Sequence, residues 1–134
     1  MNDMKETNAV IEAVEEVEEK PYTLRRLKDK DLFPILKIVG EVFPDDLSTA
    51  FMQVASGEKK INEIGFAVVT KLIVAMLKNL HKVREDLYEL LSDISGIPAA
   101  EIEEMEFGTT PMMIWDIVRN EKNVGFFKVL SKLS

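Results

Sequence analysis

One stretch decides the fold of this chain: GFAVVTKLIVAMLKNLHKVREDLYELLSDISGIP, residues 65–98. Its first half is apolar around most of a helical circumference, and only Lys71 and Lys78 clearly require water. A helix of this kind is buried on several sides, by its own domain or by another subunit. The second half, residues 83–94, has a single apolar face. The sequence therefore predicts a bend near Asn79–His81 and a separate amphipathic helix after it.

The segments on either side repeat this helical pattern, with glycine and proline at the helix ends. Gly96 followed by Pro98 ends one helix and begins the next. The expected helices begin at Asp31, Asp45 or Asp46, Asn62, near Val83, Pro98, Thr110 and Asn123. Asp31 and Asn123 are expected to act as N-caps. We predict an all-α fold, a compact array of about seven short-to-medium helices, with at most one short extended segment near Tyr22–Leu27.

The chain divides into an acidic arm, residues 1–20, and a single helical domain, residues 21–134. The acidic arm carries seven acidic side chains and two lysines, a net charge of −5. Val10, Val14 and Val17 recur at spacings of four and three, which would give a narrow apolar stripe on a helix. A stripe this narrow anchors weakly, so the sequence favours a mobile or fraying arm, with a docked helix as the alternative.

Composition excludes several classes of function. The chain has no cysteine and one histidine, His81, which excludes thiolate zinc sites, iron–sulfur clusters and multi-histidine metal sites. No glycine-rich nucleotide-binding loop and no G-x-S-x-G motif occurs. A formal charge of −7 opposes general nucleic-acid binding. We therefore predict no enzyme, no catalytic, cofactor-binding or metal-binding residues, and no nucleic-acid partner.

No segment predicts export or membrane insertion. The acidic arm lacks the basic region and the apolar core of a signal peptide. The most apolar run, Ile64–Leu77, is too short to span a bilayer and contains Lys71. We therefore expect a cytoplasmic protein with no membrane partner.

Apolar side chains are more numerous than a domain of short helices requires. We take as candidate protein-binding residues Met112, Met113, Trp115, Phe126 and Phe127. Methionine and aromatic side chains adapt to irregular partners, although the alternative is that all five belong to the core. The helix that is apolar nearly all round supplies the candidate oligomer contact, which consists of Ile64, Val68, Leu72 and Met76.

Three passages carry a resemblance to a known family. They are DLFPILKIV at residues 31–39, the region 65–107, and NVGFFKVLSKL at residues 123–133. The second passage contains LLSDISGIPAAEIEEMEF, in which one helix ends, a new one begins at Ile97–Pro98 and an acidic turn follows. Together the passages resemble tail assembly chaperones of long-tailed bacteriophages and prophages from Gram-positive hosts, over roughly residues 22–134.

The resemblance implies a non-enzymatic role. Proteins of this family are small and mainly helical; they oligomerise, often into spirals, and coat the long tape-measure protein before the tail tube polymerises around it. They are often made in two lengths by a ribosomal frameshift, and the longer form recruits tube subunits. The resemblance thus implies a homo-oligomer in the host cytoplasm, absent from the mature virion. Its partners would be the tape-measure protein and, through a frameshifted longer form, the major tail tube protein.

Two other classes of function stay open. A helical protein-interaction regulator of a phage or prophage, of the transcriptional regulator or anti-repressor type, would also combine apolar helix surface with an absence of catalytic motifs. A small enzyme or metal carrier is the other class, and metal bound to the purified protein would reveal it.

Overall fold

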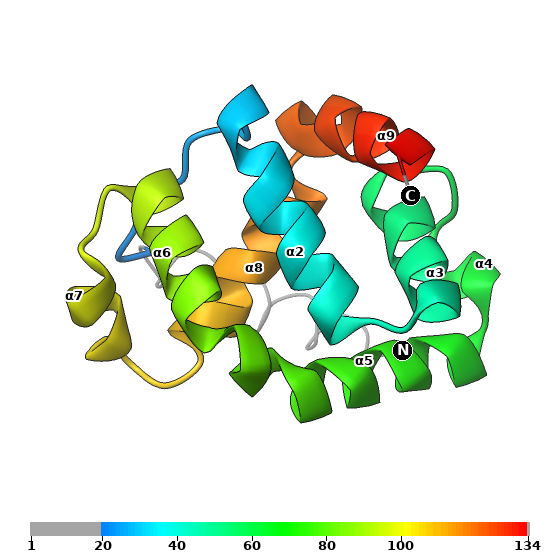
Figure 1. The fold of residues 1–134 in the computed structure, drawn as a ribbon, viewed down its shortest axis with the longest axis horizontal. Helices are drawn as coiled ribbons and strands as arrows, with labels where there is room; N and C mark the ends of the chain where they lie inside the picture. Colours follow the sequence, from blue (N-terminus) through cyan, green and yellow to red (C-terminus); the bar gives the residue numbers. More distant parts are fainter. Residues whose placement is uncertain (1–19, 134) are drawn as a thin grey trace, which may run out of the picture.

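The structure, a computed structural model, describes residues 20–133, and every regular element in that range is a helix (Figure 1). The α-helices are α2 (Leu32–Val42), α3 (Asp45–Ala55), α4 (Ile61–Ile64), α5 (Phe66–Asn79), α6 (Arg84–Ser95), α7 (Ala99–Glu103), α8 (Thr109–Arg119) and α9 (Val124–Leu133). Three 3-10 helices are η1 (Asp29–Asp31), η2 (Leu80–Val83) and η3 (Glu121–Asn123). The predicted all-α fold is confirmed. The expected extended segment, Tyr22–Leu27, has no regular structure and pairs with no strand among the described residues.

Helix α2 lies at the centre of the arrangement and crosses in front of α8 in the view of Figure 1. Helices α6 and α7 lie on one side of it and α3 and α4 on the other, while α5 and α9 form opposite edges. A single cluster of buried apolar side chains draws on all of the longer helices. Its most deeply buried members are Met52, Val83, Leu91, Met113, Phe127 and Leu130.

The predicted helix boundaries hold at Gly96 and near Asn79, and one boundary needs correction. Gly96 ends α6 with φ +75°, the left-handed conformation that glycine adopts without a steric penalty. The bend expected after Asn79 is the 3-10 helix η2. The helix expected to run on from Asn62, however, is interrupted: Gly65 has φ 88° and ψ 151°, which separates α4 from α5. This conformation ends α4 at Ile64 and makes Gly65 the N-cap of α5, where its carbonyl accepts the Val69 backbone N–H at 3.1 Å.

Two residues expected to cap helices have other partners. The buried Asn123 side chain accepts a hydrogen bond from the Leu27 backbone N–H (2.8 Å) and donates one to the Ile117 carbonyl (2.9 Å). Asp31 occupies the N-cap position of α2 but makes no capping bond there; it accepts the Lys28 backbone N–H at 2.7 Å instead. Both side chains are only 1% exposed, and buried polar groups of this kind need full hydrogen bonding. Asn123 therefore fastens the segment before α2 to the rest of the domain, whereas Asp31 holds the local turn of that segment.

Arg25 completes this attachment. Its guanidinium forms a two-pronged pair with the Asp31 carboxylate (2.8 and 3.1 Å) and also contacts Asp93 of α6 at 2.6 Å. Its backbone N–H donates to the Ile94 carbonyl at 3.0 Å. Burial opposes ionisation of Asp31, but the hydrogen bonds from Arg25 and the Lys28 N–H outweigh it and lower the pKa of Asp31 below its ordinary value.

Candidate protein-interaction surfaces

The outer face of α5 is an exposed apolar surface. We call Phe66, Ile73 and Leu77 the α5 stripe; they are 88%, 53% and 79% exposed. Spacings of seven and four place these side chains on one face of the helix. The opposite face packs on the core through Ala75 and its neighbours. The α5 stripe thus lies at the edge of the molecule with no partner among residues 20–133 (Figure 1).

The four candidate oligomer residues lie elsewhere on this segment. Ile64 and Val68 are half-buried, as are Leu72 and Met76, which pack against the core of their own domain. The residues chosen from the sequence do not include the α5 stripe, because apolar side chains occupy most of the circumference of this helix and its inward face is hard to single out. Contact of the four residues with another subunit stays a prediction.

A second exposed apolar surface lies at and before α8. We call Phe107, Met112 and Trp115 the α8 surface; Phe107 is fully exposed, and Met112 and Trp115 are 40% and 49% exposed. Met112 and Trp115 are three residues apart, so they share one face of the helix. Phe107 precedes Gly108, whose φ of +93° forms the turn into α8.

The structure divides the five candidate protein-binding residues. Met112 and Trp115 are exposed, whereas Met113 and Phe127 are 0% and 2% exposed and belong to the core. Phe126 is half-buried and packs edge-on against Phe127, with ring centroids 5.6 Å apart. For Met113 and Phe127 the core alternative therefore holds, and neither offers surface to a partner. Consecutive helical residues point about 100° apart, so Met112 and Met113 cannot share one environment, but the sequence alone does not say which methionine is inside.

Two grooves of opposite charge meet the α8 surface. The first, about 610 Å³ in volume, is lined by Trp115, Ile61 and other residues of α8 and of the segment between α3 and α4. Its charged lining residues are Lys59, Lys60 and Arg119. The second groove, about 520 Å³, includes Phe107 and Met112 of the α8 surface. Its charged lining residues are Lys20, Glu104 and Glu106. We call them the basic groove and the acidic groove.

Asp116 anchors the beginning of the described chain on α8. Its carboxylate accepts hydrogen bonds from the Lys20 ammonium (2.8 Å) and the Tyr22 hydroxyl (2.5 Å). Arg119, which lines the basic groove, lies 3.5 Å from the other carboxylate oxygen. Burial opposes ionisation of Asp116, but the bonds from Lys20 and Tyr22 outweigh it, and the pKa of Asp116 is lowered. The chain therefore enters the described domain at the acidic groove, which Lys20 and Tyr22 line, and Asp116 links this entry point to Arg119 of the basic groove.

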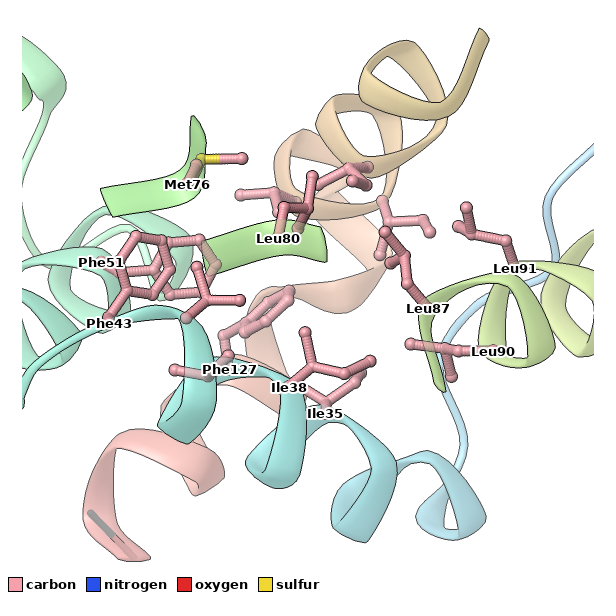
Figure 2. Close-up of a pocket in the computed structure, with 15 residues that line it drawn as sticks. Ile35, Ile38, Phe43, Phe51, Met76, Leu80, Leu87, Leu90, Leu91 and Phe127 are labelled. Carbon is pink, nitrogen blue, oxygen red and sulfur yellow. The ribbon is translucent and has the colours of Figure 1, made fainter. Parts of the chain in front are cut away.

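An apolar cavity of about 80 Å³ lies where α2, α5, α6, α8 and α9 converge (Figure 2). In that view Ile35 and Ile38 reach it from α2, and Leu87 and Leu91 from α6, while Phe127 lies beside Ile38. All of its lining side chains are hydrocarbon, aromatic or thioether groups. Ligand sites in proteins usually measure about 300–1,000 Å³ and contain a few oriented polar groups. We interpret this cavity as a packing gap of the core.

The described residues contain no cluster of three or more histidine or acidic side chains arranged to hold a metal ion. Within the same range, every helix is too short or too polar to cross a membrane. Comparison of the chain with protein-family models, with curated proteins and with solved structures finds no match. The candidate interaction sites are defined by their exposed apolar side chains, those of the α5 stripe and of the α8 surface.

Proposed function

We propose that this protein is a non-enzymatic tail assembly chaperone that self-associates and binds the tape-measure protein, keeping it soluble while the tail tube assembles. One observation carries the proposal: large apolar side chains of the α5 stripe and the α8 surface face solvent although the core is already filled. Exposed apolar patches of this kind mark protein-interaction sites. The resemblance described above supplies the kind of partner.

The two surfaces suit two tasks. The α5 stripe is a straight row of aliphatic and aromatic groups on one helix, the kind of face that packs against a second helix. The α8 surface combines a methionine with two aromatic rings and is bordered by grooves. Flexible and aromatic side chains accept irregular apolar partners. We assign self-association to the α5 stripe and client binding to the α8 surface.

Weak individual contacts are sufficient for this role. A long client with an apolar stripe presents the same chemistry many times, so an assembly of chaperone subunits binds it by avidity rather than through one tight site. The net charge of −7 would keep a loaded complex in solution.

Co-expression with a phage tape-measure protein tests the proposal. The full chain should keep that partner in the soluble fraction. Replacing Met112 and Trp115 together with aspartate should abolish the effect and leave the helical circular dichroism spectrum unchanged, because both side chains are exposed. Phe33→Asp is the matched control, since Phe33 is an exposed aromatic residue on α2.

Three outcomes would count against the proposal. The partner could be equally soluble with and without this protein, which would remove the functional claim. The Met112 and Trp115 variant could remain fully active, which would place client binding elsewhere. Equal loss of activity in the Phe33→Asp control would show that added negative charge, and not the α8 surface, causes the effect.

A further inference from the structure

We propose that the basic groove is the docking site for the acidic arm of the same chain, and that residues 1–19 cover Trp115 when they occupy it. Two features of the molecule support this docking: the charges of the basic groove and the place where the described chain begins.

The basic groove has an apolar floor and a positive rim. Trp115 and Ile61, both about half-exposed, supply apolar surface. Lys59 and Lys60 are exposed, and neither takes part in any salt bridge of the described residues. Arg119 has one contact, the 3.5 Å approach to Asp116. The groove therefore presents positive charge that has not been neutralised, next to an exposed tryptophan.

The acidic arm has the complementary chemistry. Residues 1–19 contain seven acidic side chains and one lysine. If residues 10–17 form a helix on docking, Val10, Val14 and Val17 would share one face, in a row about 10 Å long at 1.5 Å per residue. Glutamates 12, 15, 16, 18 and 19 surround them in the sequence. In the docked arm the valines would pack on Trp115 and Ile61, and the glutamates would lie beside Lys59 and Lys60. Both the apolar and the charged groups of the groove would then have partners.

The arm is attached to the domain close to the basic groove, so it has to span only a short distance to reach it. Lys20, at the edge of the acidic groove, pairs with Asp116 at 2.8 Å, and Arg119 of the basic groove lies 3.5 Å from the same carboxylate. Val17 is only three residues upstream of Lys20, a distance that an extended chain covers in about 10 Å. Because the arm is tethered beside the groove, its effective concentration there is high and even modest contacts suffice.

The acidic groove is the competing site near the same tether, and its charge argues against it. Its charged lining residues are Lys20, which Asp116 already pairs, and Glu104 and Glu106, which would repel a segment with a strong negative charge. A second copy of the chain could also supply the arm to the basic groove, and dilution distinguishes that arrangement from the intramolecular one.

Docking has a consequence for client binding, and this consequence alone rests on the proposed function. Trp115 belongs to the α8 surface, so a docked arm and a client would compete for it. The arm would then shield the apolar surface of the empty chaperone and be displaced by a client that offers more contacts. The docking itself is tested without any client.

Trp115 is the only tryptophan of the chain, so its fluorescence reports directly on the groove. In the full chain we expect Trp115 to be protected from acrylamide, with blue-shifted emission. The protection should fall as salt is raised, because charges near the surface are screened. Lys59→Glu with Lys60→Glu should remove the protection and shift the emission to the red. Lys128→Glu with Lys132→Glu, a matched reversal on α9, should leave both readings unchanged.

A charge swap makes the test specific. Changing Glu15, Glu16, Glu18 and Glu19 to lysine should release the arm from the wild-type groove and expose Trp115. Combining these changes with Lys59→Glu and Lys60→Glu should restore the protection, which no general effect of net charge would do. Circular dichroism of each full-length variant checks that the domain is folded.

The proposal is overturned if neither charge reversal changes the fluorescence of Trp115, or if the combined variant fails to restore protection. If protection of Trp115 disappears on dilution, the arm comes from a second copy of the chain, and docking within one chain is overturned. Failure of the client experiment above, with the charge swap successful, would remove the proposed function and leave the docking intact.

Discussion

Helices α5 and α6 adjoin each other in the sequence, yet they use their apolar residues in opposite ways. In α6, Leu87, Leu90, Leu91 and Ile94 are all buried and the outer face is charged. In α5, a more apolar helix, only Ala75 is buried, while Phe66 and Leu77 face solvent. Hydrophobicity therefore does not measure burial in this protein. Helix α6 belongs to the core, whereas α5 closes the core with one face and presents the other (Figure 1).

The sharpest test of this difference uses the same substitution on both helices. Leu91→Ala removes a fully buried side chain and should lower the free energy of unfolding by about 2–5 kcal/mol. Leu77→Ala removes an exposed side chain and should change it by less than about 0.5 kcal/mol. Urea denaturation at low protein concentration measures both values. Similar losses for the two variants would mean that the outer face of α5 is buried after all.

A second prediction concerns the segment before α2. Asn123→Ala should cost about 1–3 kcal/mol, because the Leu27 N–H and the Ile117 carbonyl would be left buried without their partner. Asn62→Ala, at an exposed position, is the control and should change stability by less than about 0.5 kcal/mol. If both variants melt alike, Asn123 does not fasten this segment.

The ion-paired carboxylates of Asp31 and Asp116 should make the free energy of unfolding depend on pH. The folded-state pKa values of Asp31 and Asp116 lie below their ordinary value of 3.8, so the unfolded chain binds protons at higher pH than the folded chain does. Their contribution to stability is complete above 3.8 and is lost as the pH falls below it, through the lowered pKa values. Urea denaturation between pH 7 and pH 3 should show this loss, and Asp31→Asn with Asp116→Asn should reduce it. An unchanged pH dependence in that variant would exclude these two groups as its source.

The smallest expected effect on stability belongs to the α5 stripe. Ile73→Asp with Leu77→Asp should change the free energy of unfolding by less than about 0.5 kcal/mol, since both positions are exposed. The same variant should reduce the mass of the assembly measured by light scattering. Lys71→Gln with Lys78→Gln, on the same helix, lowers the net charge by the same two units and is the matched control. Assemblies of equal mass in the stripe variant and the wild type would remove self-association through this face.

Much of the helix layout could be predicted from the sequence, because helix ends are local events. Gly96 and Pro98 mark the end of α6 and the start of α7 through the conformations that these two residues favour. The interruption at Gly65 was missed, since a single glycine between apolar residues is compatible with a continuous helix. Of the candidate site, Met112 and Trp115 were found by composition, and Phe66, Ile73 and Leu77 were not.

The sequence by itself determined that the protein is helical, that its longest apolar segment exceeds the needs of one contact face, and that chemistry based on cysteine or on several histidines is excluded. Only the tertiary structure decided which side of α5 faces outward and that Phe127, not Phe126, enters the core. It also decided that Asn123 bonds to Leu27, 96 residues away. The physical reason is common to all three. Local preferences depend on neighbours within one helical turn, whereas burial and long-range hydrogen bonds depend on how separate helices pack together.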